Sequence, residues 1–233
     1  MHLGIETVNT FREAIEKNEW MSTSTMIGFP QEDYTTLESI RETGGIMPDS
    51  CWESNRALAL QAIDLTAEYS IDFLSMHAGF IDHDDVEGYQ KFCARIRVLA
   101  DAAYENKVML LLETGQESAA DLRACLEDLN HPALGVNFDP ANMILYGMGD
   151  PIEAVRILAP WIKHVHIKDA VKSAVPGEWG TEVPWGDGDV DASKFMQTLE
   201  EIGYTGALAI EREGGDTRAD DIQLAADRLG EMI

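Results

Sequence analysis

The sequence predicts an α/β fold in which parallel strands and helices alternate and the strands close into a barrel of the TIM (β/α)8 type. From about residue 50 onward, short apolar runs alternate with longer segments of helical period, as in repeated βα units. Five of these runs end in an acid or a histidine, and the C-terminal ends of barrel strands are where functional groups gather. A chain of 233 residues with 45% hydrophobic composition suits one such core. No linker is visible, so we expect a single domain over residues 1–233.

The N-terminal fifty residues carry the weakest pattern. Residues 2–8 and 20–27 are strand candidates around a short helix near 11–17. Residues 28–49, rich in Gly, Pro, Thr and acids, are expected to form a long loop, and loops of that length in compact domains are usually functional.

The remaining elements follow in alternation and bring the expected number of strands to seven. The strands are predicted at 71–77, 108–113, 134–139, 162–167 and 207–211. The helices are predicted at about 55–69, 86–106, 118–129, 151–158, 192–202 and 218–232.

Several helix boundaries are marked by local chemistry. Ser118 can cap the helix that follows it, with Asp121 three residues on. Asp150 followed by Pro151 provides a cap and a first helical residue that needs no N–H donor. Gly203 stands where a helix would end.

Composition and charge exclude several classes of partner. The formal charge is −25, from 42 acidic and 17 basic residues, so the chain repels polyanions and we expect no nucleic-acid partner. No apolar stretch reaches the roughly 18 residues of a membrane span, and the start lacks a secretion signal, so we expect a cytoplasmic protein without a membrane partner. Cys51, Cys93 and Cys125 show no CxxC spacing and are interpreted as free thiols.

The polar residues that end the apolar runs carry the chemistry. Each follows a stretch that should be buried, where an isolated charge would cost several kcal/mol unless it were paired or bound to a metal. Convergence on one cation removes that cost. The residues are His77, Glu113, Asp139, His166 and Glu211.

Strand alternation sharpens this prediction. If the side chains of Glu113, Asp139, His166 and Glu211 point into the barrel, then the residues two positions earlier, which include Asn137 and His164, also point inward. His164 would lie one layer beneath His166, suited to a supporting hydrogen bond, and Lys168 would project just above it. Three carboxylates and one imidazole favour Mn²⁺ or Mg²⁺, with Zn²⁺ or Co²⁺ as alternatives.

At these positions the chain resembles the sugar phosphate isomerase/epimerase family, the xylose isomerase-like barrels that include enzymes of the D-tagatose 3-epimerase type. The resemblance covers roughly residues 70 to 233 and is fairly specific when the motifs are taken together. Its motifs are LLLET at Glu113, GVNFDPANM at Asp139, HVHIKD at His166, the PWGDGDVD loop and LAIERE at Glu211.

The resemblance implies one metal held by Glu113, Asp139, His166 and Glu211, with Glu113 and Glu211 exchanging a proton on opposite faces of a ketose. Removing a proton next to a carbonyl requires stabilisation of the enediolate, which a cation at its oxygens provides. The chain departs from the family in two ways. It has Asn142 where tagatose-type epimerases place a substrate-contacting histidine, and it begins at what corresponds to the second strand. A truncated start, a neighbouring subunit that covers the gap and a wrong assignment of the first fifty residues are the alternatives.

Further side chains are candidates for substrate binding, each with a structural alternative. They are His77, Asn142, His164, Lys168, Trp185 and Arg212. Lys168 and Arg212 are interpreted as contacts for a substrate hydroxyl or phosphate or as rim charges, and Trp185 as a wall of the site or as loop packing. Glu117 and His83 are interpreted as ordinary loop charges.

The predicted function is that of a metal-dependent isomerase or epimerase of a small sugar or sugar phosphate. An inosose-type dehydratase is the nearest alternative, because the same enediolate can expel a β-hydroxyl. A barrel that binds a polyol without catalysis is the non-enzymatic alternative, and a nuclease is disfavoured by the acidic charge. An open barrel edge makes a homodimer or homotetramer a further expectation.

Overall fold

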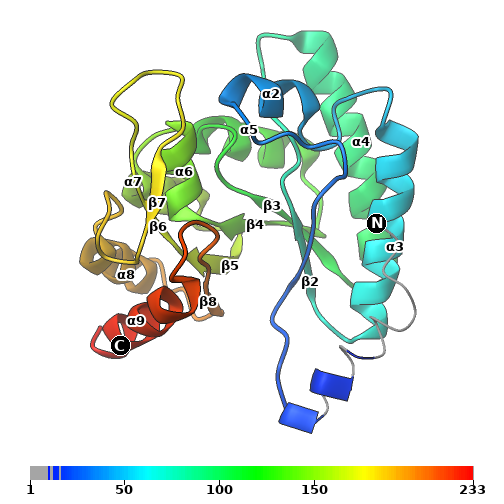
Figure 1. Ribbon diagram of the computed structural model, residues 1–233. Helices are drawn as coiled ribbons and strands as arrows, with labels where there is room; N and C mark the ends of the chain where they lie inside the picture. Colours follow the sequence, from blue (N-terminus) through cyan, green and yellow to red (C-terminus); the bar gives the residue numbers. More distant parts are fainter. Residues whose placement is uncertain (1–9, 11–12, 16, 233) are drawn as a thin grey trace.

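A curled parallel sheet of six strands forms the centre of the computed structural model, which describes residues 10, 13–15 and 17–232 (Figure 1). The strand order is β1-β2-β3-β4-β5-β8, and every neighbouring pair is parallel. The described part of the chain is thus a half-barrel, and β1 and β8 form its two edges. The strands are β1 (Thr25–Ile27), β2 (Phe73–Met76), β3 (Met109–Glu113), β4 (Leu134–Phe138), β5 (Ile162–Ile167) and β8 (Leu208–Ile210).

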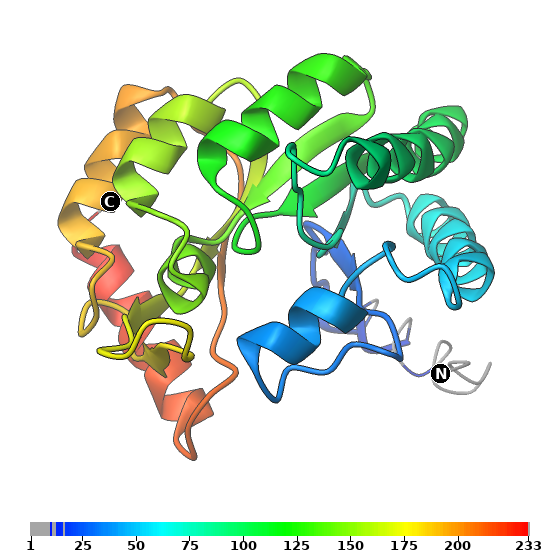
Figure 2. The ribbon, with the colours of Figure 1, turned by 90° about the horizontal axis from the view of Figure 1, so that it is seen from above.

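Helices surround the sheet, and most of them cover the outer side of the curl (Figure 2). They are α2 (Leu37–Thr43), α3 (Trp52–Glu68), α4 (Val86–Glu105), α5 (Ala119–Leu129), α6 (Pro140–Tyr146), α7 (Pro151–Leu158), α8 (Ala192–Glu201) and α9 (Arg218–Gly230). Of these, α2 and α6 lie at the ends of the strands (Figure 1, Figure 2). An antiparallel ribbon of β6 (Asp169–Val171) and β7 (Thr181–Val183) follows β5. None of the helices in the described ranges is long and apolar enough to cross a membrane.

The two faces of the sheet differ in chemistry. Phe138 of β4 stacks on Phe195 of α8, with ring centroids 5.9 Å apart, so the face that carries Phe138 lies against the helices. Because side chains alternate along a strand, Asn137 and Asp139 face the concave side. The helix-facing side holds the apolar core, whereas the concave side collects buried polar groups.

The predicted helix boundaries are confirmed at three positions. The hydroxyl of Ser118 accepts the backbone N–H of Asp121 at 3.2 Å at the start of α5. Asp150 accepts the backbone N–H of Ile152 at 2.7 Å, with Pro151 as the first helical residue of α7. Gly203, with φ at +72°, follows the end of α8.

The structure confirms the five strand positions predicted after residue 70 and corrects the earlier part. The strand predicted at 2–8 lies outside the described residues, and within 20–27 only Thr25–Ile27 pairs with a neighbour. Among residues 11–17, those that the structure describes are helical. The expected loop at 28–49 contains α2, while α6 and the β6–β7 ribbon were not predicted.

Candidate metal centre

The four predicted metal ligands meet on the concave side of the sheet, where the strands end. Each offers one ligand atom, and these atoms all lie within 4.8 Å of one another. Glu113 ends β3, Asp139 follows β4, His166 lies near the end of β5 and Glu211 follows β8. The side chains of the first three are buried, and that of Glu211 is 26% exposed. Four segments far apart in the sequence thus bring three carboxylates and one imidazole together.

The imidazole of His166 stands at the centre of the cluster. Its Nδ1 lies 3.2 Å from Glu211 Oε2, 3.4 Å from Glu113 Oε1 and 3.6 Å from Asp139 Oδ2. Burial alone would lower the pKa of His166, but these three carboxylates raise it to about 12. Within the described residues, Nδ1 makes no hydrogen bond of good geometry. Three carboxylate oxygens therefore surround this nitrogen, and a cation bound among them would reduce their mutual repulsion.

Asp139 supplies a direct test of whether a metal fits. Its Oδ1 accepts the backbone N–H of Asn142 at 3.0 Å and so caps α6. Its Oδ2 is buried and has no hydrogen-bond partner among the described residues. A buried carboxylate oxygen without a partner is costly, and a bound cation would satisfy it. The donor set of this cluster therefore fits a divalent metal.

Two amides donate hydrogen bonds to the carboxylate of Glu113. Asn137 Nδ2 donates to Glu113 Oε2 and Asn142 Nδ2 donates to Oε1, each at 3.1 Å. Burial would raise the pKa of Glu113, but the nearby His77 and His166 lower it. His77 Nε2 lies 3.7 Å from Glu113 Oε1. Asn142 and His77, predicted from sequence as substrate contacts, thus lie beside a predicted ligand.

His164 lies one layer beneath His166, as strand alternation predicts, with ring centroids 5.6 Å apart. Its Nδ1 lies 2.9 Å from Asn137 Oδ1, and its Nε2 lies 3.1 Å from the hydroxyl of Thr23. Burial lowers the pKa of His164 to about 4, so the ring is neutral near pH 7. Because the amide nitrogen of Asn137 lies 3.3 Å from His166 Nε2, this asparagine links the two histidines to Glu113.

Lys168 lies against the cluster rather than on the rim. Its side chain is 2% exposed, and its Nζ contacts Glu211 Oε2 at 2.9 Å, Glu213 Oε2 at 2.7 Å and Asp139 Oδ2 at 3.6 Å. Burial would lower the pKa of Lys168, but Asp139, Glu211 and Glu213 raise it. The ammonium therefore stays charged and holds Glu211 in place. Glu213 was not singled out from the sequence, because it lies beyond the strand.

Arg212 and Trp185, predicted as substrate contacts or as structural residues, contact side chains outside the cluster of four. The guanidinium of Arg212 contacts Glu182 of β7 and Asp221 of α9, each at 2.9 Å, and ties these elements to the end of β8. Trp185 is 2% exposed and packs edge-on against Phe195 of α8, with centroids 5.8 Å apart. Among the described residues, neither side chain forms an ion pair or hydrogen bond with Glu113, Asp139, His166 or Glu211.

Glu117 differs from its interpretation as an ordinary loop charge. Its side chain is buried, with the residue only 7% exposed, and burial raises its pKa to about 8, with Asp121 adding to the shift. His83 Nε2 lies 3.1 Å from the backbone oxygen of Asp121. Sequence pattern did not reveal the burial of Glu117, because the residue lies in a polar loop after β3.

Aromatic residues that the sequence analysis missed border the cluster. Tyr146 ends α6, and its hydroxyl accepts a hydrogen bond from Gln116 Nε2 at 3.4 Å. Its ring meets Phe80 at 6.0 Å and Trp179 at 4.8 Å, both edge to face. A Cβ at Gly115 would lie 3.2 Å from the Tyr146 ring, so this close approach requires glycine. One sequence signal pointed here: Asp139–Pro140 repeats the helix-start pattern of Asp150–Pro151.

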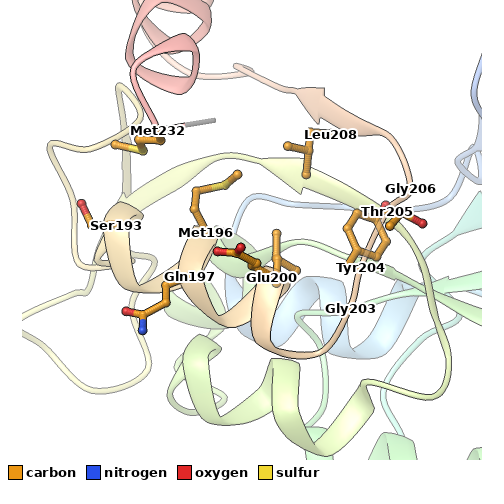
Figure 3. A pocket seen from close by; sticks show the side chains of 11 residues that line it. Ser193, Met196, Gln197, Glu200, Gly203, Tyr204, Thr205, Gly206, Leu208 and Met232 are labelled. Atoms are coloured by element: carbon orange, nitrogen blue, oxygen red, sulfur yellow. The ribbon is translucent and has the colours of Figure 1, made fainter.

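A groove of about 710 Å³ lies elsewhere, along α8, the loop after it and β8 (Figure 3). Met196, Leu199, Leu208 and Met232 supply its apolar lining. None of the predicted site residues lines this groove. The size of a cavity therefore does not locate the candidate site, whereas the convergence of charged ligands does.

Comparisons with family models and with solved structures indicate the same family. The family model described as "Xylose isomerase-like TIM barrel" matches residues 4–232. The crystal structure of a xylose isomerase domain protein from Planctomyces limnophilus superposes with a TM-score of 0.93 at 35% identity and covers 97% of this chain and 83% of that one. A xylose isomerase-like protein from Mycobacterium smegmatis, solved in complex with magnesium, gives 0.71 at 21% identity and covers 98% and 80% of the two chains.

Curated relatives include both lyases and epimerases. The chain is 26% identical to a 3-dehydroshikimate dehydratase from Bacillus anthracis over 51% of this chain and 48% of that protein. It is 27% identical to an Escherichia coli (strain K12) protein provisionally named as an L-ribulose-5-phosphate 3-epimerase, over 72% of this chain and 60% of that protein. The matches thus span about half the length of these relatives.

Proposed function

The chain belongs to the xylose isomerase-like TIM barrel family, and from this premise we propose that it is an enzyme that transfers a proton on a small sugar or sugar phosphate with one divalent metal ion. The observation that carries the proposal is the convergence of four ligand atoms within 4.8 Å at the ends of four strands. Buried acids are gathered in this way where they share a cation.

Glu113, Asp139, His166 and Glu211 would hold the metal. Three oxygen donors and one nitrogen suit Mn²⁺ or Mg²⁺, with Zn²⁺ or Co²⁺ as alternatives. When bound, the cation supplies positive charge beside the oxygen on which negative charge develops as a neighbouring C–H proton is removed. The magnesium complex of the Mycobacterium smegmatis relative supports this assignment.

The two glutamates are the proposed proton carriers. They come from β3 and β8, two segments with β4 and β5 between them, so a substrate at the cluster would have one on each side. Asn137 and Asn142 fix Glu113 by hydrogen bonds, and Lys168 fixes Glu211. One glutamate, ionised, takes a proton from the carbon next to a carbonyl, and the other, which has taken a proton from water, returns it to the opposite face. Return to the same carbon gives an epimer, and return to the neighbouring carbon gives an isomer.

Dehydration is the second candidate function, and Lys168 is the observation that favours it. Its buried ammonium lies 2.9 Å from Glu211 Oε2 and can donate a hydrogen bond to a hydroxyl that leaves from the carbon beyond the reacting one, while the carboxyl that has taken the C–H proton supplies the proton that makes it water. The similarity to the Bacillus anthracis dehydratase points the same way. Product analysis separates the two, because only dehydration forms water and an unsaturated product.

Solvent exchange tests the proposal without knowledge of the natural substrate. The metal-loaded protein is incubated in deuterated water with a panel of ketoses and ketose phosphates, and recovered sugar is analysed for deuterium. We expect label next to the carbonyl of at least one sugar, and Glu211→Gln should lower its rate by roughly a hundredfold or more.

Glu213→Gln is the matched control, because Glu213 also binds Lys168 but lies outside the four clustered ligands. This variant should keep most of the exchange. Full exchange in Glu211→Gln would show that the base is assigned wrongly, and absence of both exchange and dehydration with every substrate would contradict the proposed function.

A further inference from the structure

Arg41 carries a charge that no carboxylate of the described residues neutralises. It lies in the last turn of α2, and its side chain is exposed. Among the residues that the structure describes, no carboxylate oxygen lies within 4.0 Å of its guanidinium. Lys168 and Arg212 differ, since each contacts at least two carboxylates.

A short row of side chains connects Arg41 to the clustered ligands. The guanidinium carbon lies 4.2 Å from the centroid of the Phe80 ring, and Phe80 meets Tyr146 at 6.0 Å. Tyr146 packs beside Gly115, two residues after Glu113. These residues all follow strand ends, and α2 lies at the same end of the sheet as the β6–β7 ribbon (Figure 1, Figure 2). Arg41 is thus linked to the segment that carries Glu113 through the rings of Phe80 and Tyr146.

The donors of Arg41 are available, because within the described residues its side chain makes no hydrogen bond or ion pair and contacts only the ring of Phe80. A guanidinium on an aromatic ring uses its face for the cation–π contact, while its N–H groups point outward in the plane. That fork matches the paired oxygens of a phosphate or carboxylate. Phe80 therefore orients Arg41 without occupying its donors.

We propose that Arg41 binds an anionic group, a phosphate ester or a carboxylate, at the end of the substrate remote from the clustered ligands. The inference rests on the proposed function for the location of the reacting end. It assigns the substrate to the class of anionic sugars or polyol acids, and it makes Arg41 the residue that selects them over neutral sugars.

Binding of unreactive probes tests this inference. Ribitol, ribitol 5-phosphate and ribonate share a carbon chain and lack a ketone or aldehyde group, so none is a substrate for the proton transfer proposed for ketoses. Their affinities are measured by calorimetry on the Mn²⁺-loaded protein at fixed ionic strength. We expect at least one anion to bind roughly tenfold to a hundredfold more tightly than ribitol, as charge-assisted hydrogen bonds give. Arg41→Gln should remove that preference.

Arg123→Gln is the matched control, because it makes the same change in net charge on an arginine of α5 that is paired with Glu127 at 2.8 Å. It should retain the preference. Equal affinity for all three probes, no binding of any, or a preference that survives Arg41→Gln would overturn the inference.

The exchange experiment separates this inference from the proposed function. If deuterium exchange occurs but anions bind no more tightly than ribitol, the proposed function stands and the proposed role of Arg41 is wrong. If anions bind more tightly through Arg41 but no substrate shows exchange or dehydration, the anion site stands and the proposed chemistry is wrong.

Discussion

Asp139 uses its two carboxylate oxygens for different purposes. One caps α6 through the backbone N–H of Asn142. The other is buried 3.6 Å from both His166 Nδ1 and Lys168 Nζ and has no hydrogen bond among the described residues. The backbone N–H of Asp139 is in turn held by the hydroxyl of Thr114 at 2.8 Å. The residue that starts α6 is therefore fixed in position, and its second carboxylate oxygen is directed to the cluster.

Glu117 gives a prediction at the residue scale. Burial raises its pKa from the ordinary 4.5 to about 8, so between these values the folded chain keeps a proton that the unfolded chain has released. Unfolding then releases protons, and the free energy of unfolding falls as the pH rises from about 5 to 8, by up to ~1.4 kcal/mol per pH unit. Glu117→Gln removes this contribution. Denaturant unfolding at several pH values should show a variant that gains stability relative to the wild type as the pH rises.

Glu178→Gln, in the exposed loop between β6 and β7, is the control and should follow the wild type. If the difference between Glu117→Gln and the wild type stays constant from pH 5 to 8, the carboxyl group does not carry the shifted pKa.

The clustered ligands were predictable from sequence because each ends an apolar strand, so its direction follows from alternation. Arg212 and Trp185 follow no such rule. Arg212 is directed by acids on β7 and α9, and Trp185 by Phe195 of α8, all contacts between segments far apart in sequence. The pattern of residues within one segment of the sequence cannot indicate partners that lie in distant segments.

The loop before α8 provides the prediction at the scale of an element. Asp169, buried at the start of β6, accepts the backbone N–H groups of Ala170, Gly186, Gly188 and Val190 at 2.8 to 3.1 Å. Asp169→Asn would place an amide donor against these donors. We expect it to lower the free energy of unfolding by roughly 2–4 kcal/mol, measured by denaturant titration.

Asp189→Asn is the matched change in the same loop, since Asp189 is exposed and accepts the single backbone N–H of Lys172 at 2.9 Å. It should cost less than about 1 kcal/mol. Equal losses in the two variants would show that Asp169 does not organise the loop.

Elements with a clear period were predicted, and those without one were missed. In α6, six of the seven residues are buried, so it has no polar face to reveal a helical period. The strands of the β6–β7 ribbon have three residues each, too few to show alternation. The helix α2 has seven residues, and its start depends on hydrogen bonds between Thr36 and Ser39 rather than on an apolar stripe.

At the scale of the molecule, the parallel order of the sheet is what makes the site. Because β3, β4, β5 and β8 are neighbours and run in one direction, residues at their ends are brought to the same edge. The sequence predicted this convergence from strand ends alone. It did not predict a sheet of six strands, since the pairing of the first segments depends on contacts of β1 with β2 that have no local pattern.

Metal titration tests the central claim most directly. Calorimetric titration of the metal-free protein with Mn²⁺ should show one ion bound per chain, accompanied by a rise in the melting temperature. Asp139→Asn should weaken binding by more than roughly tenfold, whereas Asp216→Asn, a change at an exposed acid after β8, should leave it unchanged. A wild-type protein that binds no divalent ion, or an Asp139→Asn variant that binds Mn²⁺ as tightly as the wild type, would contradict the assignment of this cluster as a metal centre.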